Sequence, residues 1–129
     1  MLYISEELDG SQVINLTRGD DAAIEVPLSD ENGMEYILGG NDYLIFDVRV
    51  LPRENSKRLI HLESSPGSNR IEFPHEVTEN LKVGQYSAEI QLMTGDKRIT
   101  VWPTLTGEKK TDDTVNRKNF VLMPEVVMP

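Results

Sequence analysis

The sequence contains no cysteine among its 129 residues. Without cysteine there can be no disulfide framework, no thiolate metal site and no cysteine nucleophile. Because small secreted domains commonly depend on disulfides, this absence favours a protein made in a reducing cytosol. The N-terminal stretch, Met-Leu-Tyr-Ile-Ser-Glu-Glu, also lacks a basic leader and a long apolar run. We therefore expect neither a secretion signal nor a membrane span.

Basic residues are scarce relative to acidic ones. The chain has 13 Lys and Arg against 22 Asp and Glu, which gives a formal net charge of −9. A nucleic-acid backbone or an anionic lipid surface would repel such a chain, so we expect neither as a partner. Aromatic residues make up only 6% of the sequence, and we expect a core built mainly from Val, Ile and Leu. The length predicts a single domain spanning residues 1–129, with its core within about residues 11–123 and short terminal tails.

The dominant pattern is an alternation of apolar and polar residues with a period of two. It is clearest in residues 43–51, YLIFDVRVL, where every second residue is apolar and would face a core: Leu44, Phe46, Val48 and Val50. The same alternation predicts strands at 85–93 and 22–28, and Pro27 would place the latter at a sheet edge or at a bulge. Weaker patterns predict further strands at 12–16, 58–62, 70–73, 98–102 and 120–123.

Turn-forming residues separate these segments. Thr94–Lys97, which contains Gly95 and Asp96 between two strand patterns, is the best candidate for a hairpin. Only residues 74–82, PHEVTENLK, suggest helix, and there we expect one short helical turn near residues 75–82. Seven or eight short strands with so little helix predict an all-β fold, an antiparallel β-sandwich.

One polar stretch, residues 106–119, interrupts this pattern with the sequence TGEKKTDDTVNRKN. It is long for a connection in a compact domain, and a solvent-exposed loop or insertion is the simpler interpretation. The alternative is a binding or assembly loop, because long exposed loops often carry function. Candidate contact residues are the charged Lys109, Lys110, Asp112 and Arg117 of this stretch and the apolar Val126 and Val127 of the C-terminal tail.

Residues 17–22, TRGDDA, contain the tripeptide Arg18-Gly19-Asp20 of adhesion ligands, followed by a second carboxylate, Asp21. Gly19 supplies backbone freedom, and aspartates can accept hydrogen bonds from nearby backbone amides. Because two strand patterns flank these residues, we interpret Arg18–Asp21 as a turn rather than an adhesion site. The adjacent carboxylates lack the alternating spacing of a calcium loop, so no metal site is expected.

Nothing in the sequence points to a catalytic centre. His61 and His75 lie in unrelated contexts without the spacing of a zinc site. No nucleophile elbow and no phosphate-binding glycine loop is present. We expect no catalytic residues and no cofactor. The single tryptophan, Trp102, could instead contribute to a platform for a sugar.

The order of the motifs resembles the immunoglobulin-like N-terminal domain of baseplate upper proteins from tails of phages that infect Gram-positive bacteria. The similarity covers about residues 11–102 and, more loosely, the strand near Phe120. It begins with the Arg18–Asp21 turn and continues with Asn41-Asp42-Tyr43-Leu44 followed by Val48-Arg49. It then includes an ordered series of single positions: Leu81, Gly84, Tyr86, Glu89, Ile90, Gln91 and Leu92. Residues 106–119 depart from the family pattern and look like an insertion.

The resemblance implies an immunoglobulin-like sandwich that serves as a non-enzymatic structural protein of a phage or prophage tail or baseplate. Its partners would be other phage structural proteins and copies of itself, and it would be assembled in the host cytoplasm and end in the virion. Exposed strand edges and loops would make the contacts, including strand addition. A rival hypothesis is a carbohydrate- or host-surface-binding module that uses exposed aromatic residues such as Trp102.

Overall fold

The structure is a computed structural model that describes residues 1–6, 11–51, 57–103 and 118–125. The described residues form nine strands and one short 3-10 turn. The strands are β1 (Leu2–Glu6), β2 (Gln12–Thr17), β3 (Ala22–Glu25), β4 (Tyr43–Arg49), β5 (Arg58–Glu63), β6 (Arg70–Phe73), β7 (Gly84–Thr94), β8 (Lys97–Trp102) and β9 (Phe120–Met123); the 3-10 turn is His75–Val77. The prediction of an all-β fold with one short helical turn is therefore confirmed.

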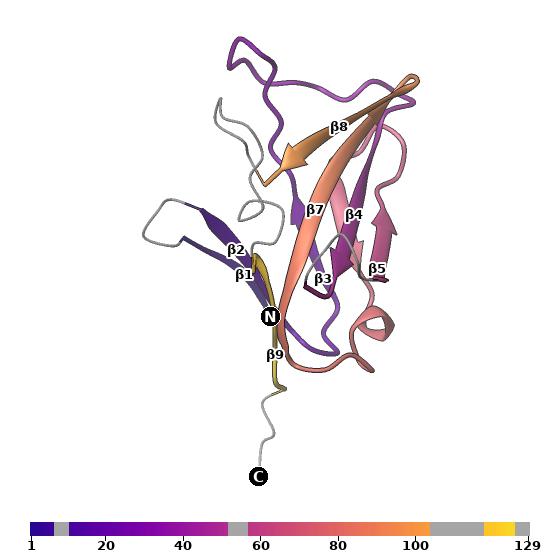
Figure 1. Ribbon diagram of the computed structural model, residues 1–129. Helices are drawn as coiled ribbons and strands as arrows, with labels where there is room; N and C mark the ends of the chain where they lie inside the picture. The colour runs from indigo at the N-terminus through magenta and orange to yellow at the C-terminus, as the bar shows by residue number, and fades with distance from the viewer. Residues whose placement is uncertain (7–10, 52–56, 104–117, 126–129) are drawn as a thin grey trace.

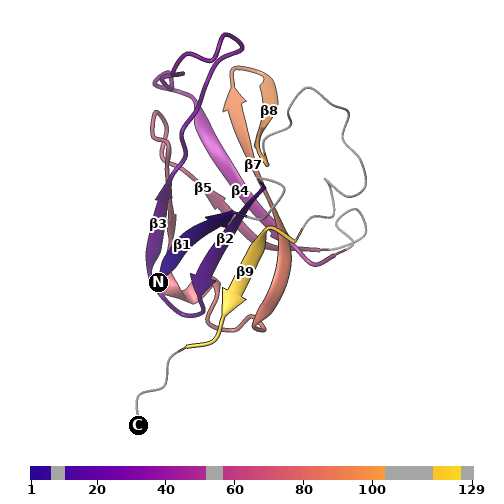
Figure 2. The same ribbon diagram turned by 90° about the vertical axis from the view of Figure 1, so that its left-hand side faces the viewer.

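The strands form two layers (Figures 1 and 2). The larger sheet has the order β1-β2-β9-β7-β4-β5, and β8 also pairs with β7. Of the strands described here by residue range, β3 and β6 form the second sheet. The long strand β7 organises the large sheet, because β9 pairs with its residues 84–86 and β8 with its residues 90–94, while β4 lies along its other edge. The molecule is thus sandwich-like, with one layer much larger than the other.

The core lies between these layers, and its inward residues follow the predicted alternation. Leu44, Phe46 and Val48 of β4 are fully buried. Although Val, Ile and Leu dominate by number, all three phenylalanines of the chain meet at the centre. The ring of Phe46 lies 5.1 Å from that of Phe73 in an edge-on arrangement and 5.9 Å from that of Phe120. The Phe46–Phe73 contact joins the two sheets, whereas Phe46 and Phe120 lie on two strands of the large sheet.

The large sheet is mixed, which corrects the prediction of a purely antiparallel sandwich. Strands β2 and β9 run parallel, with Ile14 opposite Phe120 and Leu16 opposite Leu122. Parallel neighbours need a long crossover, and here most of the domain lies between the two strands. The sequence pattern of either strand does not predict this parallel pairing, because the two segments are about a hundred residues apart.

Strand β1 was not among the predicted strands. It pairs antiparallel with β2, and Ile4 lies opposite Ile14. Its sequence, LYISE, shows little alternation because it lies at the outer edge of the sheet, where side chains on both faces stay partly exposed. Two finer expectations were wrong. Val50 lies beyond the end of β4 and is exposed, and Ser87, which the alternation in residues 85–93 predicts to face outward, is buried.

Other local predictions hold. The hairpin between β7 and β8 turns at Gly95 and Asp96, and Gly95 has a φ of 59° at the first central position, as a type II′ turn requires. The strand predicted at 22–28 is shorter in the structure: β3 ends at Glu25, before Pro27, and pairs only with β6 among the described strands, in keeping with the expected edge position. Most of the polar stretch 106–119 lies outside the described residues, but Asn119 at its end is buried rather than solvated.

Candidate functional site

The Arg18–Asp21 segment is a tight turn that leads from β2 towards β3. The backbone N–H of Asp20 donates to the carbonyl of Thr17 at 3.2 Å. Gly19 has a φ of 81°, in the left-handed region that favours glycine. Its N–H donates at 2.8 Å to the hydroxyl of Thr78, which is fully buried. The turn is therefore fastened to the segment that follows the 3-10 turn.

The charged side chains of this turn bond to the protein's own surface. The Nε of Arg18 donates to Glu125 at 3.1 Å, and its Nη1 donates to the carbonyl of Leu81 at 3.3 Å. The Oδ1 of Asp21 accepts the backbone N–H of His75 at 2.7 Å and lies 3.0 Å from its Nδ1. The hydrogen bond from the backbone of His75, assisted by its ring, lowers the pKa of Asp21. The bonded ring in turn has a raised pKa.

Substitutions in this turn should separate its backbone role from its surface contacts. Gly19→Val should lower the free energy of unfolding by about 1–3 kcal/mol, because a β-branched residue is strained at this φ. Arg18→Ala should lower it by less than about 1 kcal/mol, since the lost bonds are at the surface. Thermal or urea unfolding of both variants measures this. A larger loss in Arg18→Ala than in Gly19→Val would contradict it.

Trp102 is partly buried at the end of β8 and packs against the core. Its indole Nε1 donates to Gln12 Oε1 at 3.3 Å, so its polar group is already engaged within the protein. The other candidate contact residues, Lys109, Lys110, Asp112, Arg117, Val126 and Val127, lie outside the described residues.

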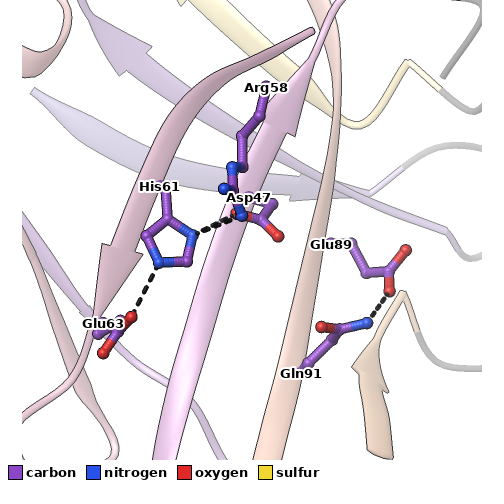
Figure 3. Close-up of polar contacts among 6 residues, drawn as sticks. All are labelled: Asp47, Arg58, His61, Glu63, Glu89 and Gln91. Carbon is purple, nitrogen blue, oxygen red and sulfur yellow. Dashed lines mark hydrogen bonds and ion pairs between the residues drawn. The ribbon is translucent and has the colours of Figure 1, made fainter. Parts of the chain in front are cut away.

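A polar network that the sequence analysis missed covers the outward face of β4 and β5 (Figure 3). Asp47 lies opposite His61 in the β4–β5 register, and its Oδ1 is 2.8 Å from Nδ1 of that ring. The other ring nitrogen, Nε2, is 2.9 Å from Glu63 Oε2. Arg58 Nη1 is 3.6 Å from Asp47. Arg58 Nη1 also lies 3.1 Å from Nδ1 of the ring, and its charge opposes protonation. A protonated imidazole can nevertheless donate to both carboxylates at once, and these two bonds favour the charged ring.

A second group of polar side chains continues the network on β7 and β8. Glu89 lies opposite Asp47 on the neighbouring strand, and like charges facing each other across a sheet repel. The two carboxylates have separate donors. His61 and Arg58 serve Asp47, whereas Glu89 accepts from Gln91 Nε2 at 2.7 Å and from Thr100 Oγ1 at 3.2 Å. The face thus carries two hydrogen-bonded groups, one that joins β4 to β5 and one that joins β7 to β8.

The hydrogen bonds to Glu63 and then to Asp47 raise the pKa of His61. A raised pKa in the folded state means that the stabilisation is fully present below the unfolded pKa, about 6.5. It is lost as the pH rises through the folded value. The spacing of two between His61 and Glu63 on β5 was the available sequence signal, but the partner on β4 became apparent only from the strand register.

We expect the stability difference between the wild type and His61→Gln to be larger at about pH 5.5 than at about pH 8.5. Urea unfolding at both pH values measures the difference, and His75 is present in both proteins, so its own titration cancels. Asp47→Asn should reduce the pH dependence, because it removes one of the two carboxylates that bond the ring. Parallel pH profiles for the wild type and His61→Gln would contradict the assignment.

In the described segments, no group of three or more His, Asp and Glu side chains is arranged to hold a metal ion. The Asp30-Glu31 doublet shows what such carboxylates do here. Asp30 Oδ1 accepts the backbone N–H groups of Asn32 at 2.9 Å and Met34 at 3.0 Å, a side-chain turn of the kind expected for aspartate. The outward polar face is likewise bonded within itself. The bond between His61 and Asp47 there links two neighbouring strands.

Within residues 1–6, 11–51, 57–103 and 118–125, no helix has the length and hydrophobicity needed to span a bilayer. Comparison with protein-family models, with curated proteins and with solved structures finds no match to this chain. The family assignment therefore stays a prediction from the sequence.

Proposed function

We propose that the chain is a non-enzymatic structural protein of a phage or prophage tail in Gram-positive bacteria, with an immunoglobulin-like domain that acts through protein–protein contacts. The observation that carries the proposal is the order of motifs along residues 11–102. The turn at Arg18–Asp21, the segment from Asn41 to Arg49 and the series from Leu81 to Leu92 follow the baseplate pattern. The sandwich-like all-β architecture agrees with what that pattern implies.

The free edge of the large sheet supports a role in association. Strand β1 is the outermost strand, and it pairs only with β2 among the described residues. Tyr3 and Ile4 are 45% and 50% exposed on this strand. In edge strands that do not associate, Lys or Pro residues often prevent pairing with another chain. Residues 2–6 contain neither. This edge suits contact with a neighbouring subunit.

Purified tail particles from the source bacterium test the proposal directly. After prophage induction, the chain should be found in assembled tails by quantitative mass spectrometry, in multiple copies per particle if it forms a symmetric oligomer. Sedimentation velocity of the isolated protein tests whether it forms the oligomer by itself. Absence of the chain from purified particles would reject the assignment to the virion.

The rival function, binding of cell-wall saccharide, has a separate test. The fluorescence of Trp102 should stay unchanged on titration with cell-wall polysaccharide, because its indole N–H is bonded to Gln12 and its ring packs against the core. A saturable change that is lost in a Gln12→Ala or Trp102→Phe variant would favour the saccharide-binding module instead.

A further inference from the structure

The inward-facing side of β8 is incompletely covered. Ile99 lies opposite Leu92 in the β7–β8 register and so belongs to the same face of the sheet. Leu92 is 6% exposed, whereas Ile99 is 44% exposed. The second sheet contains only β3 and β6, and no strand in the described part of the chain lies over Ile99. The sandwich therefore leaves the apolar surface of β8 around Ile99, here called the strip, exposed.

A hollow beside this strip has walls on both sides. Leu28, Tyr36, Leu92, Ile99 and Val101 form its apolar surface, and the turn of the β7–β8 hairpin closes one end. The opposite wall is the segment that follows β3, which Figure 1 shows at the same end of the molecule as that hairpin turn. The hollow is therefore bounded by a sheet edge and by a second, separate segment of backbone.

That second wall is held in place by its own hydrogen bonds. Ser29 and Glu35 form a β-bridge, and the N–H of Tyr36 donates to the carbonyl of Leu28 at 3.0 Å. The hydroxyl of Tyr36 donates to Asp42 Oδ2 at 2.9 Å. Asp42 is itself buried, and the N–H of Gly39 donates to the same oxygen at 2.9 Å. The hollow is preformed and needs little reorganisation to accept a ligand.

The outer edge of strand β8 also presents backbone groups that a further strand could pair with. Its only strand partner within the described ranges is β7, on one edge. An unpaired strand edge presents a row of N–H and C=O groups that an extended peptide can pair with, and pockets beside it can take alternate side chains. The strip around Ile99 lies where such side chains would point.

The charges around the hollow indicate which kind of peptide segment would bind there. The rim of the hollow carries the carboxylates of Asp30, Glu31 and Asp96, against one cation, Lys97, among its described lining residues. The chain as a whole has a net charge of −9. A second copy of this acidic chain would be repelled, whereas a segment with Lys or Arg beside its apolar residues would be attracted.

We propose that the hollow beside β8 binds an extended segment of a different protein, which adds as a strand to the β8 edge. Alternate apolar side chains of the segment cover Ile99, and its basic residues face Asp30, Glu31 and Asp96. This inference deepens the proposed function and rests on it only in taking the partner to be another tail protein.

The probe for this proposal is a short acetylated peptide in which valine and lysine alternate. Amide chemical shifts of the labelled protein report the binding position, and their change over a peptide titration gives the affinity. We expect shifts along β8 and residues 28–36, and at least about tenfold weaker binding in Ile99→Asp. Val83→Asp is the matched control, because Val83 is 42% exposed and does not line the hollow; its affinity should be unchanged.

Two further peptides separate specific binding from simple attraction to an acidic protein. A glycine–lysine peptide has the same charge without the apolar side chains, and a valine–glutamate peptide reverses the charge. Both should bind at least about tenfold more weakly than the valine–lysine peptide. Charge reversal by Glu31→Lys, which leaves the hydrogen bonds of Asp30 in place, should reduce this preference for lysine over glutamate.

Several results would overturn the proposal: equal affinity for all three peptides, shifts confined to β1, or unchanged binding by Ile99→Asp. Self-association of the wild type that Ile99→Asp abolishes would identify a second copy as the occupant instead. Incorporation of Ile99→Asp into tail particles at the wild-type level would reject the hollow as an assembly site while the tail assignment stands. Absence of the wild type from tails would reject that assignment, and the peptide experiment would still decide whether the hollow binds.

Discussion

Replacing Asn119 with alanine is expected to lower the free energy of unfolding by about 2–4 kcal/mol. Its side-chain Oδ1 accepts the backbone N–H of Ala88 at 2.6 Å, and its Nδ2 donates to the carbonyl of the same residue at 3.0 Å. Asn119 is only 1% exposed. Without the amide, two buried backbone groups in the middle of β7 lose their partner, and each unsatisfied group costs about 1–3 kcal/mol.

The position of Asn119 explains why its amide is needed. Strand β9 begins at Phe120, and it pairs with β7 only along residues 84–86. On the same edge of β7, the pairing with β8 starts at Ile90. Ala88 falls in the gap between the two partner strands, and the side chain of Asn119 takes the place of a strand there. The carbonyl of Asn119 also accepts the N–H of Ile14 at 2.8 Å, which ties β2 to the same point.

Two variants sharpen this prediction. Asn119→Asp keeps the shape but has no N–H to donate, so at neutral pH its buried carboxylate would face the carbonyl of Ala88. It should be at least as destabilising as alanine near pH 7 and should partly recover in acid, where a protonated carboxyl can donate. Lys118→Ala, at the exposed neighbouring position, should change stability by less than about 0.5 kcal/mol. Urea unfolding with an unchanged m-value measures all three, and a loss below about 0.5 kcal/mol in Asn119→Ala would contradict the assigned role.

Replacing Phe46 with alanine should lower the free energy of unfolding by about 3–5 kcal/mol. Phe46 is fully buried and contacts the rings of Phe73 and Phe120. Phe73 belongs to the second sheet, so the lost ring opens a cavity between the two layers. The neighbours of this ring are fully buried side chains on hydrogen-bonded strands, so we expect the cavity to collapse only partly.

Phe46→Leu keeps part of the volume and should cost roughly half as much, which provides a measurable variant if the alanine protein does not fold. Met34→Ala removes an apolar side chain that is 66% exposed and should change stability by less than about 0.5 kcal/mol. Chemical denaturation of the three variants tests the order. Similar losses in Phe46→Leu and Met34→Ala would show that the ring does not bridge the layers as described.

Local sequence patterns determined most of the strands. The alternation of Leu44, Phe46 and Val48 depends only on neighbouring residues, because a strand turns successive side chains to opposite faces. The hairpin at Gly95 and the turn at Gly19 are equally local, since each depends on a backbone conformation that glycine permits. The predicted strands at 70–73 and 120–123 have the same limits in the structure, as Arg70–Phe73 and Phe120–Met123, because their pattern also depends only on neighbouring residues.

Tertiary structure alone decided the features that join distant segments. The parallel pairing of β2 with β9, the amide of Asn119 beside Ala88 and the bond between His61 and Asp47 each connect residues with no shared local pattern. In sequence, Asn119 ends a polar stretch and Ile99 is one apolar residue of a strand. The arrangement of the strands around β7 buries Asn119 and leaves Ile99 exposed. Burial depends on which segments pack over a position and not on the polarity of the residue itself.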